Sequence, residues 1–329
     1  LNNVAYQNVN LKPSTQNLEG ADNRPYYDRR DEIDDTYSRI MLGYNTNLGY
    51  TYNITASLTK PFDNGVSGTV AYSYGDAFTV FDGTSSQNSS QWRNFANVQG
   101  RNFDQQLGRS EFSQGHRIIA GVNYKFDWNE GRNATTTFGL FYEGISGTPY
   151  SYVYNDGGAI QNEDSREYSL IFVPATQADI NLIDDGTRTA AQQWEELNSF
   201  IESDPYLSTI RGEYAERFSN RAPMAHVIDF KVVQDFAFMA GGKKHTFQLT
   251  ADIFNFTNFM SSGWGRRYGA GSFGAFQLID FEGFEDNSLR PQFTFPGVED
   301  NNVSLDNIDD SGIQSSRWQM QLGVRYIFE

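Results

Sequence analysis

The sequence predicts an all-β protein, a transmembrane antiparallel β-barrel, from three observations. Residues 317–328, close to the end of the chain, alternate apolar and polar side chains as a strand with two different faces does. Aromatic residues make up 15% of the 329 residues, yet every apolar run is far shorter than the roughly 18 residues of a membrane helix. Short turns also alternate with long polar connections, an asymmetry typical of membrane barrels.

The composition limits the partners and the kinds of site that the protein can have. A net charge of −16 argues against nucleic acid as a partner. The absence of cysteine excludes disulfides and thiolate metal sites. A mean hydropathy of −0.58 suits a barrel, because only every second strand residue meets lipid. Leu1 is followed by neither a basic nor an apolar signal region, so we expect a processed chain or a piece of a longer one.

The first clear strand covers residues 48–59, with Leu48, Tyr50, Tyr52, Ile54, Ala56 and Leu58 on its apolar face. Before it, residues 1–10 alternate only weakly, as the end of a strand would, and residues 11–47 are polar enough to form a loop. Asn64-Gly65 supplies the positive φ of a hairpin turn, and residues 66–74 form the return strand.

Five further strands follow the same alternation, giving about eight strands in all. They cover residues 117–126, 135–146, 228–232, 246–253 and 317–328. Short turns at 61–65, 127–133 and 239–244 are expected on the periplasmic side, and extracellular loops at 11–47, 81–115, 147–223 and 258–312. We expect aromatic girdles near the strand ends, formed by Tyr72, Tyr74, Tyr124, Phe126, Tyr142, Tyr326 and Phe328.

The last strand has a second expected role as the membrane-insertion signal that the barrel assembly machinery reads. Its lipid-facing side chains are Trp318, Met320, Leu322, Val324, Tyr326 and Phe328. Taken alone, the same pattern also fits an amphipathic strand of a soluble sandwich. The alternation of short and long connections decides for the membrane, with outer-membrane lipid and lipopolysaccharide as surroundings.

One helix is predicted inside the longest loop. Thr189 and Gln192 fit a capping box, Leu197 and Ile201 share a face with Trp194, and Asp204-Pro205 ends the helix. We interpret it as a helix that packs the loop.

Nothing in the sequence argues for catalysis, a cofactor or a metal. There is no G-x-S-x-G elbow, and His116, His226 and His245 are far apart in sequence, so hydrogen-bonded or solvated roles are expected. Two acidic clusters could bind Ca²⁺, although neither has EF-hand spacing and a solvated acidic loop is the preferred interpretation. They are Asp156 with Glu163 and Asp164, and Asp184 with Asp185.

Aromatic and arginine side chains in the long loops are the candidates for ligand binding, because this composition is typical of binding hot spots. They are Trp92, Tyr150, Tyr152, Tyr154, Trp264, Arg266 and Arg267. The alternative is that the aromatic residues pack the loops against one another.

The chain resembles the C-terminal β-barrel portion of TonB-dependent outer-membrane receptors, and more narrowly the Oar-like group of Bacteroidetes. The resemblance covers most of the chain and rests on GYTYNITASLTKPF at 49–62, AYSYG at 71–75, GTSS at 83–86, QW at 91–92, HRI at 116–118, FYEGISGTPYSYVY at 141–154, IFVP at 171–174, FIESDPYL at 200–207, RGEYAER at 211–217, RAP at 221–223, DIFNFTN at 252–258, WG at 264–265 and the terminal strand. The chain departs from the family at residues 217–220 and at Glu329.

The resemblance implies a barrel of about 22 strands with an N-terminal plug and a TonB-binding box. Neither the plug nor the box is in this sequence, so we expect the last strand to pair with a first strand outside it. The implied function is TonB-energised movement of a substrate across the outer membrane, inward or outward, with the loops capturing the ligand. A different hypothesis is a structural or assembly barrel in a complex with other outer-membrane or surface subunits, and an outer-membrane enzyme is the weakest.

Overall fold

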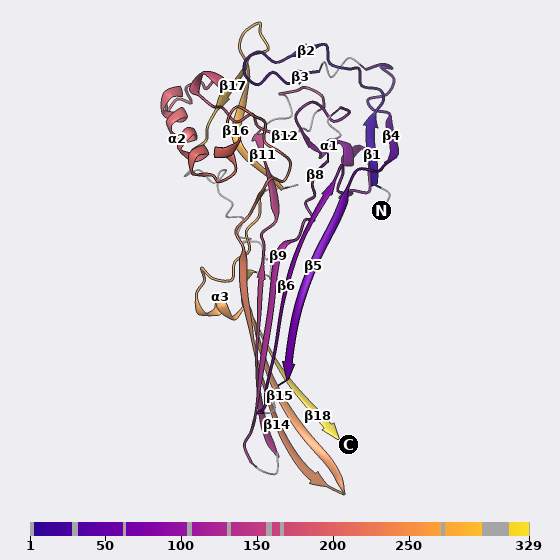
Figure 1. The fold of residues 1–329 in the computed structure, drawn as a ribbon, viewed down its shortest axis with the longest axis vertical. Coiled ribbons are helices and arrows are strands. Elements are labelled where there is room, and N and C mark those ends of the chain that lie inside the picture. The colour runs from indigo at the N-terminus through magenta and orange to yellow at the C-terminus, as the bar shows by residue number, and fades with distance from the viewer. Residues whose placement is uncertain are drawn as a thin grey trace.

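The computed structural model describes residues 3–27, 32–61, 64–103, 107–129, 133–155, 160–164, 168–270, 274–297 and 316–328. A long sheet of antiparallel strands forms the lower part of the molecule, and the long connections gather at one end of it (Figure 1). We call this gathered part the cap; it comprises the described residues of 3–46, 80–114, 146–224 and 274–297. Leu1, residues 62–63, 130–132, Asp156, residues 298–312 and Glu329 carry predictions that lie outside the described residues.

Seven long strands make the sheet, in the order β18-β15-β14-β10-β9-β6-β5, and every neighbouring pair is antiparallel. They are β5 (Tyr50–Pro61), β6 (Val66–Thr79), β9 (Gly115–Asp127), β10 (Ala134–Ile145), β14 (Ala225–Ala240), β15 (Lys243–Phe254) and β18 (Gln319–Phe328), and the short β8 (Gly108–Arg109) pairs with β6. The strand predicted at 228–232 is therefore much longer than expected. Its C-terminal half still places Phe236 and Phe238 on the apolar side, although Gln234 interrupts that side.

The register places the predicted apolar sides of all seven strands on one face. One row across the sheet on this face runs Gly68, Val122, Leu140, Phe230, Ile253 and Met320. The neighbouring row on the opposite face runs Ser67, Asn123, Gly139, Lys231, Asp252 and Gln321. The sheet thus has an apolar face, which we call the outer face, and a polar inner face, as the period-2 alternation predicts.

Tight turns join the strands at the end away from the cap. Gly65 adopts φ +83°, and a Cβ there would lie 2.5 Å from the carbonyl oxygen of Lys125, so only glycine fits. Gly241 and Gly242, with φ +60° and +78°, connect β14 to β15. The turn positions predicted from the sequence are confirmed wherever the structure describes them.

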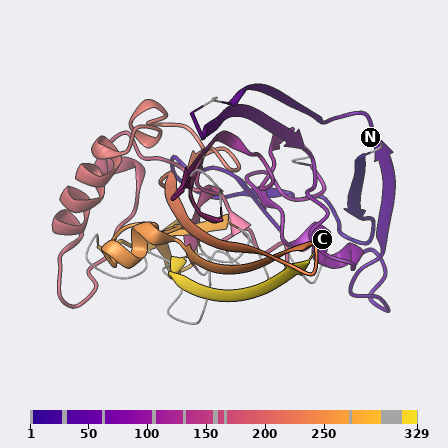
Figure 2. The same ribbon diagram turned by 90° about the horizontal axis from the view of Figure 1, so that it is seen from below.

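The sheet is curved but open. Seen along the strands in Figure 2, it forms an arc, and β5 and β18 are its two edges. Within the described residues these edges do not pair with each other. None of the described helices is both long and apolar enough to cross a membrane.

The cap corrects the picture of irregular loops, because most of it folds. Segment 11–47 contains β2 (Gln16–Asn17), β3 (Pro25–Tyr26) and β4 (Met41–Thr46), and segment 81–115 contains α1 (Asn88–Arg93), β7 (Ala96–Asn97) and β8. Segment 147–223 contains β11 (Pro149–Asn155), β12 (Tyr168–Ser169), η2 (Gln177–Asp179), α2 (Ala190–Ser203), η3 (Leu207–Thr209) and β13 (Asn220–Arg221). Segment 258–312 contains β16 (Ala275–Phe284) and β17 (Pro291–Thr294). The weak first strand is β1 (Asn3–Asn8), which pairs with β4 and does not join the long sheet.

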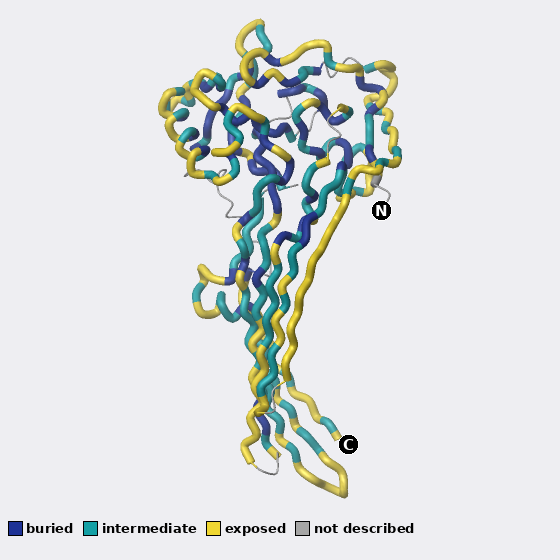
Figure 3. Tube along the Cα trace, viewed as in Figure 1, coloured by how far each residue is buried: buried dark blue, intermediate teal, exposed yellow. Residues whose placement is uncertain are grey.

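The buried core lies in the cap (Figure 3). β11 pairs in parallel with β16, β16 pairs with β17, and α2 packs beside them. Helix α2 confirms its prediction: Thr189 and Gln192 form both capping-box hydrogen bonds, and Leu197 and Ile201 are fully buried. Strand pairing satisfies backbone groups that a loop would leave to water, and the apolar core packs the paired segments together, so these long connections fold.

The prediction that the outer face contacts lipid is testable at Leu322, which is 74% exposed on the outer face of the edge strand β18. Leu322→Arg should destabilise the membrane-inserted protein by about 2–4 kcal/mol, because it places a charge at mid-membrane depth. Urea unfolding in lipid vesicles measures the change. Gln321→Arg, on the inner face of the same strand, should cost much less. Equal losses from both would contradict the assignment of the faces.

Candidate binding cavity in the cap

The three tyrosines predicted to bind ligand lie on β11, deep in the cap. Tyr150, Tyr152 and Tyr154 are at most 3% exposed, because both faces of β11 are covered. The Tyr152 hydroxyl donates to Asp204 at 2.5 Å, and the Tyr154 hydroxyl donates to Asp22 at 3.0 Å. Their geometry is that of packing residues, the alternative foreseen for the loop aromatics, and their role in binding stays a prediction.

Trp92 is also enclosed. It projects from α1 with no exposed surface, and its indole N–H donates to Asn102 at 2.9 Å. The guanidinium carbon of Arg101 lies 5.3 Å from its ring centroid, and Arg101 forms a fully buried ion pair with Glu163 at 2.9 Å. Trp92 therefore covers the buried ion pair of Arg101 and Glu163 and shields this pair from water.

Trp264, Arg266 and Arg267 lie elsewhere, beside the sheet and outside the cap. Trp264 is 61% exposed. Arg267 forms an ion pair with Glu143 at 2.9 Å, and Glu143 also pairs with Arg117 at 2.7 Å. The structure therefore does not bring the seven predicted residues into one site.

Hydrogen bonds from arginines and other protein groups occupy the described acidic residues that could bind Ca²⁺, and Glu163 and Asp164 are buried rather than solvated, contrary to the expectation of a solvated loop. Asp164 accepts from Arg39 at 2.7 Å and from Arg93 at 2.8 Å. Burial alone would raise the pKa of Asp164, but these two arginines hold the pKa below its usual range. Asp185 accepts hydrogen bonds from Thr187 and Arg188, which lower its pKa strongly. Across the described ranges, no three His, Asp or Glu side chains lie close enough to hold a metal ion.

The cap does contain a cavity of about 320 Å³ where it meets the end of β6. This volume falls within the range of small-molecule sites, about 300–1,000 Å³. Its walls combine polar and apolar groups in similar measure and carry two arginines and one glutamate. They are Phe78, Phe95, Ala96, Val98, Gln99, Leu107, Gly108, Arg109, Leu170, Tyr214, Ala215, Glu216, Arg217 and Ser219.

Arg217 is fixed in the wall of this cavity. Its Nη1 donates to the carbonyl of Val80 at 2.6 Å, its Nη2 donates to the carbonyl of Thr79, and its guanidinium carbon lies 4.5 Å from the ring centroid of Phe95. A Cβ on Gly108 would come within 2.6 Å of the Arg217 Nε, so a larger residue there would displace the Arg217 side chain.

Arg109 brings the second positive charge to the cavity. Its Nε donates to Asp76 at 3.2 Å, and its Nη1 donates to the carbonyl of Phe218 at 3.0 Å. Its guanidinium carbon lies 5.7 Å from the ring centroid of Phe78. Two guanidinium groups between aromatic walls can bind a small ligand that has an apolar body and a negative charge.

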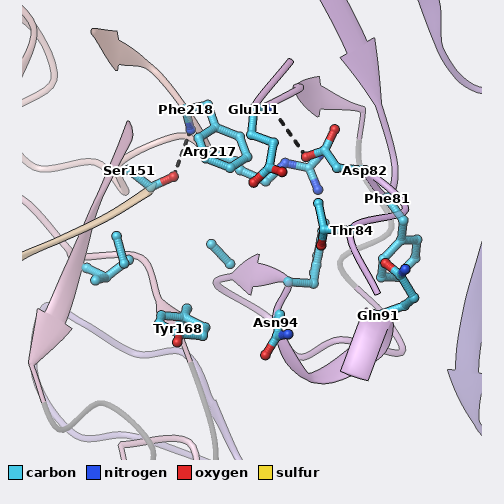
Figure 4. Close-up of a pocket in the computed structure, with 14 residues that line it drawn as sticks. Phe81, Asp82, Thr84, Gln91, Asn94, Glu111, Ser151, Tyr168, Arg217 and Phe218 are labelled. Carbon is cyan, nitrogen blue, oxygen red and sulfur yellow. Dashed lines mark hydrogen bonds between the residues drawn. The ribbon is translucent and has the colours of Figure 1, made fainter. Parts of the chain in front are cut away.

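A smaller hollow of about 30 Å³ lies on the other side of Arg217 (Figure 4). Asp82, Glu111 and Arg217 gather along one side of it, and Asn94 and Tyr168 lie across from them. The backbone N–H of Glu111 donates to Asp82 at 3.3 Å, so the two carboxyl groups share a confined space. Burial first, and the charge of Asp82 second, raise the pKa of Glu111.

Sequence reasoning missed the cavity residues, although one signal pointed at them. The departure from the family pattern at residues 217–220 falls in the cavity wall. Phe218 there adopts φ +51°, and its N–H donates to the Ser151 hydroxyl at 2.8 Å. A bulky residue in the left-handed region is unusual and often marks a functional segment.

Comparison with known proteins gives one match. The family model described as outer membrane beta barrel domain matches residues 1–277. No curated protein and no solved structure matches the chain.

The raised pKa of Glu111 predicts that the stability of the cap depends on pH. This raised pKa means that the folded cap keeps the Glu111 proton to higher pH than the unfolded chain does. The stability that Glu111 contributes is therefore complete below the ordinary pKa of glutamate and is lost as the pH rises through the raised pKa.

Glu111→Gln should consequently raise the melting temperature of the cap at about pH 7.5 and lose this advantage at about pH 4. Thermal unfolding followed by near-UV circular dichroism measures both. Glu195→Gln, at an exposed position on α2, is the control and should change neither. A Glu111→Gln effect that does not vary with pH would contradict the assignment.

Proposed function

Since this chain belongs to the outer membrane beta barrel domain family and therefore resides in the bacterial outer membrane, we propose that it moves a substrate across that membrane with energy from TonB. The cap is the extracellular side, where the ligand is captured, and the tight turns face the periplasm. The protein acts as a transporter rather than an enzyme. TonB is engaged through a region outside this sequence, and the barrel assembly machinery inserts the chain.

The cavity between the cap and the end of β6 carries this proposal. A cavity of about 320 Å³ with aromatic walls and two fixed arginines is a place to hold a small molecule. A scaffold barrel would need a surface for its partner subunits, whereas a ligand-sized cavity gives it no advantage. The resemblance to TonB-dependent receptors is the reason for proposing TonB as the source of energy.

Cap packing supports a capture role as well. Ion pairs tie segments that are distant in sequence: Arg101 with Glu163, which is fully buried, and Asp164 with Arg39 and Arg93. The Nη2 of Arg24 also donates to the carbonyl of Leu170 at 2.7 Å. Such pairs hold the cavity walls in place, so that little conformational entropy is lost when a ligand binds.

The orientation is tested with two epitope tags at exposed turns. A tag after Asp286, in the turn between β16 and β17, should bind antibody on intact cells. A tag between Gly241 and Gly242 should bind antibody only after the outer membrane is permeabilised. Both sites have room, since Gly241 and Gly242 have no described atoms near their Cβ positions and Asp286 is exposed. The reverse pattern would overturn the orientation.

Transport is tested by uptake from a defined mixture of siderophores, glycans and peptides, measured by mass spectrometry of the medium. Cells that lack the gene should leave one class of compound unconsumed, and deletion of TonB should cause the same loss. Leu107→Trp, which fills the cavity, should reduce uptake, whereas Phe112→Trp, at an exposed position, should not. Uptake that persists without TonB, or no difference for any compound, would favour the scaffold hypothesis.

A further inference from the structure

Helix α3 (Phe256–Met260) leaves the end of β15 and projects sideways from the sheet, below the cap (Figure 1). Four large apolar side chains on and beside it are exposed: Phe259 by 46%, Met260 by 62%, Trp264 by 61% and Trp318 by 44%. We call these four the lateral patch. An apolar group of this size on a protein surface marks a contact with a partner or with lipid.

The lateral patch is held rigidly. Asn255 adopts φ +52°, is 3% exposed, and caps α3 by accepting from the backbone N–H of Asn258. Its side-chain amide also donates to the carbonyl of Gly265 at 2.8 Å, and this hydrogen bond holds the chain after α3 against the N-terminus of the helix. A Cβ on Gly265 would lie 2.0 Å from the Asn255 Oδ1. The left-handed backbone of Asn255 and its buried side-chain amide thus hold these apolar side chains outward.

The patch is continuous with the outer face of the sheet. The ring of Phe256 lies 5.6 Å from that of Phe230, which belongs to the apolar row. The ring of Phe259 lies 5.0 Å from that of Trp318, and the Trp318 N–H donates to Asn258 at 3.3 Å. Since the outer face of an outer-membrane barrel contacts lipid, the patch borders lipid directly.

Its height matches a membrane boundary. The N–H of Asn255 donates to Asp229 at 2.7 Å, which fixes α3 at the level of this residue of β14. Phe238, on the outer face near the turn, stacks with Phe247. Nine residues separate 229 from 238, about 30 Å along a strand. A tilt of about 40° reduces this to about 23 Å along the membrane normal, close to the apolar band of about 25 Å.

A positive charge stands beside the patch. The Nε of Arg266 donates to the carbonyl of Ser262 at 2.7 Å, and no carboxylate in the described ranges forms an ion pair with Arg266. Arg267, by contrast, is paired with Glu143. In a chain of net charge −16, a cation at the lipid boundary suits an anionic headgroup.

We propose that the lateral patch and Arg266 form an interfacial anchor for a phosphate-bearing lipid of the cap-side leaflet. Phe259, Met260, Trp264 and Trp318 enter the boundary between headgroups and acyl chains, and Arg266 binds the lipid phosphate. This assigns Trp264 and Arg266 to lipid rather than to the transported substrate. The anchor does not depend on transport, and it fixes the height of the sheet in the membrane.

Spin labels measure the depth of the patch in the full-length protein in lipid vesicles. The chain has no cysteine, so Met260→Cys, Leu322→Cys and Asp286→Cys each give one labelling site. The label at 260 should be more accessible to oxygen than to a nickel chelate, as at 322, whereas the label at 286 should show the reverse. A label at 260 that behaves like 286, or that neither reagent reaches, would overturn the lipid assignment; the second result would indicate a protein partner.

The phosphate contact is tested by native mass spectrometry with added bisphosphorylated lipid A and with the same lipid after dephosphorylation. Arg266→Gln should bind the phosphorylated lipid about fivefold more weakly, the factor that corresponds to about 1 kcal/mol for one basic residue at an anionic surface. Arg266→Lys should retain most of the binding, and Arg290→Gln, an exposed arginine in the cap, should retain all of it. Equal loss from Arg290→Gln, or no loss from Arg266→Gln, would overturn the assignment of Arg266.

Discussion

The requirement that backbone N–H and C=O groups be hydrogen-bonded inside hydrocarbon governs this structure. Seven strands meet it with long antiparallel ladders, and the register they share turns a period of two in the sequence into two faces of opposite polarity. The row through Val122, Leu140 and Phe230 lies on the apolar outer face, which is predicted to contact lipid, and the row through Asn123, Gly139 and Lys231 lies on the polar inner face. A shift of one residue in any pairing would exchange these faces, so the ladder also determines which side chains meet the membrane.

The cap is stabilised differently from the sheet. The cap has short strands and a modest apolar core, and its ion pairs join segments that lie far apart in the chain. Arg101 with Glu163 is fully buried, and Arg24 is enclosed between the rings of Tyr154 and Tyr214. Removing one partner of such a pair would leave a buried charge, at a cost of about 3–5 kcal/mol. The pairs therefore make the arrangement of the loops specific, which a cavity with fixed arginine walls requires.

The structure separates two kinds of aromatic residue that look alike in sequence. The β11 tyrosines and Trp92 build the cap, whereas Trp264 and Trp318 lie where the sheet meets the membrane boundary. Between them, the cavity holds Arg109 and Arg217 against Phe78 and Phe95. The residues that pack the cap are thus different from those proposed to capture a ligand and from those proposed to set the depth in the bilayer.

The sequence alone determined the long sheet, because its pattern is local: alternation, turn glycines and the asymmetry of the connections all lie within short windows. It also placed α2, whose capping box and apolar stripe are equally local. Only the tertiary structure decided the cap and its cavity. Arg217 reaches Val80, the residue after β6, across 137 positions, and Arg101 reaches Glu163 across 62. Whether Tyr152 or Trp264 is buried depends on which distant segments cover it, and composition within one segment carries no information on that.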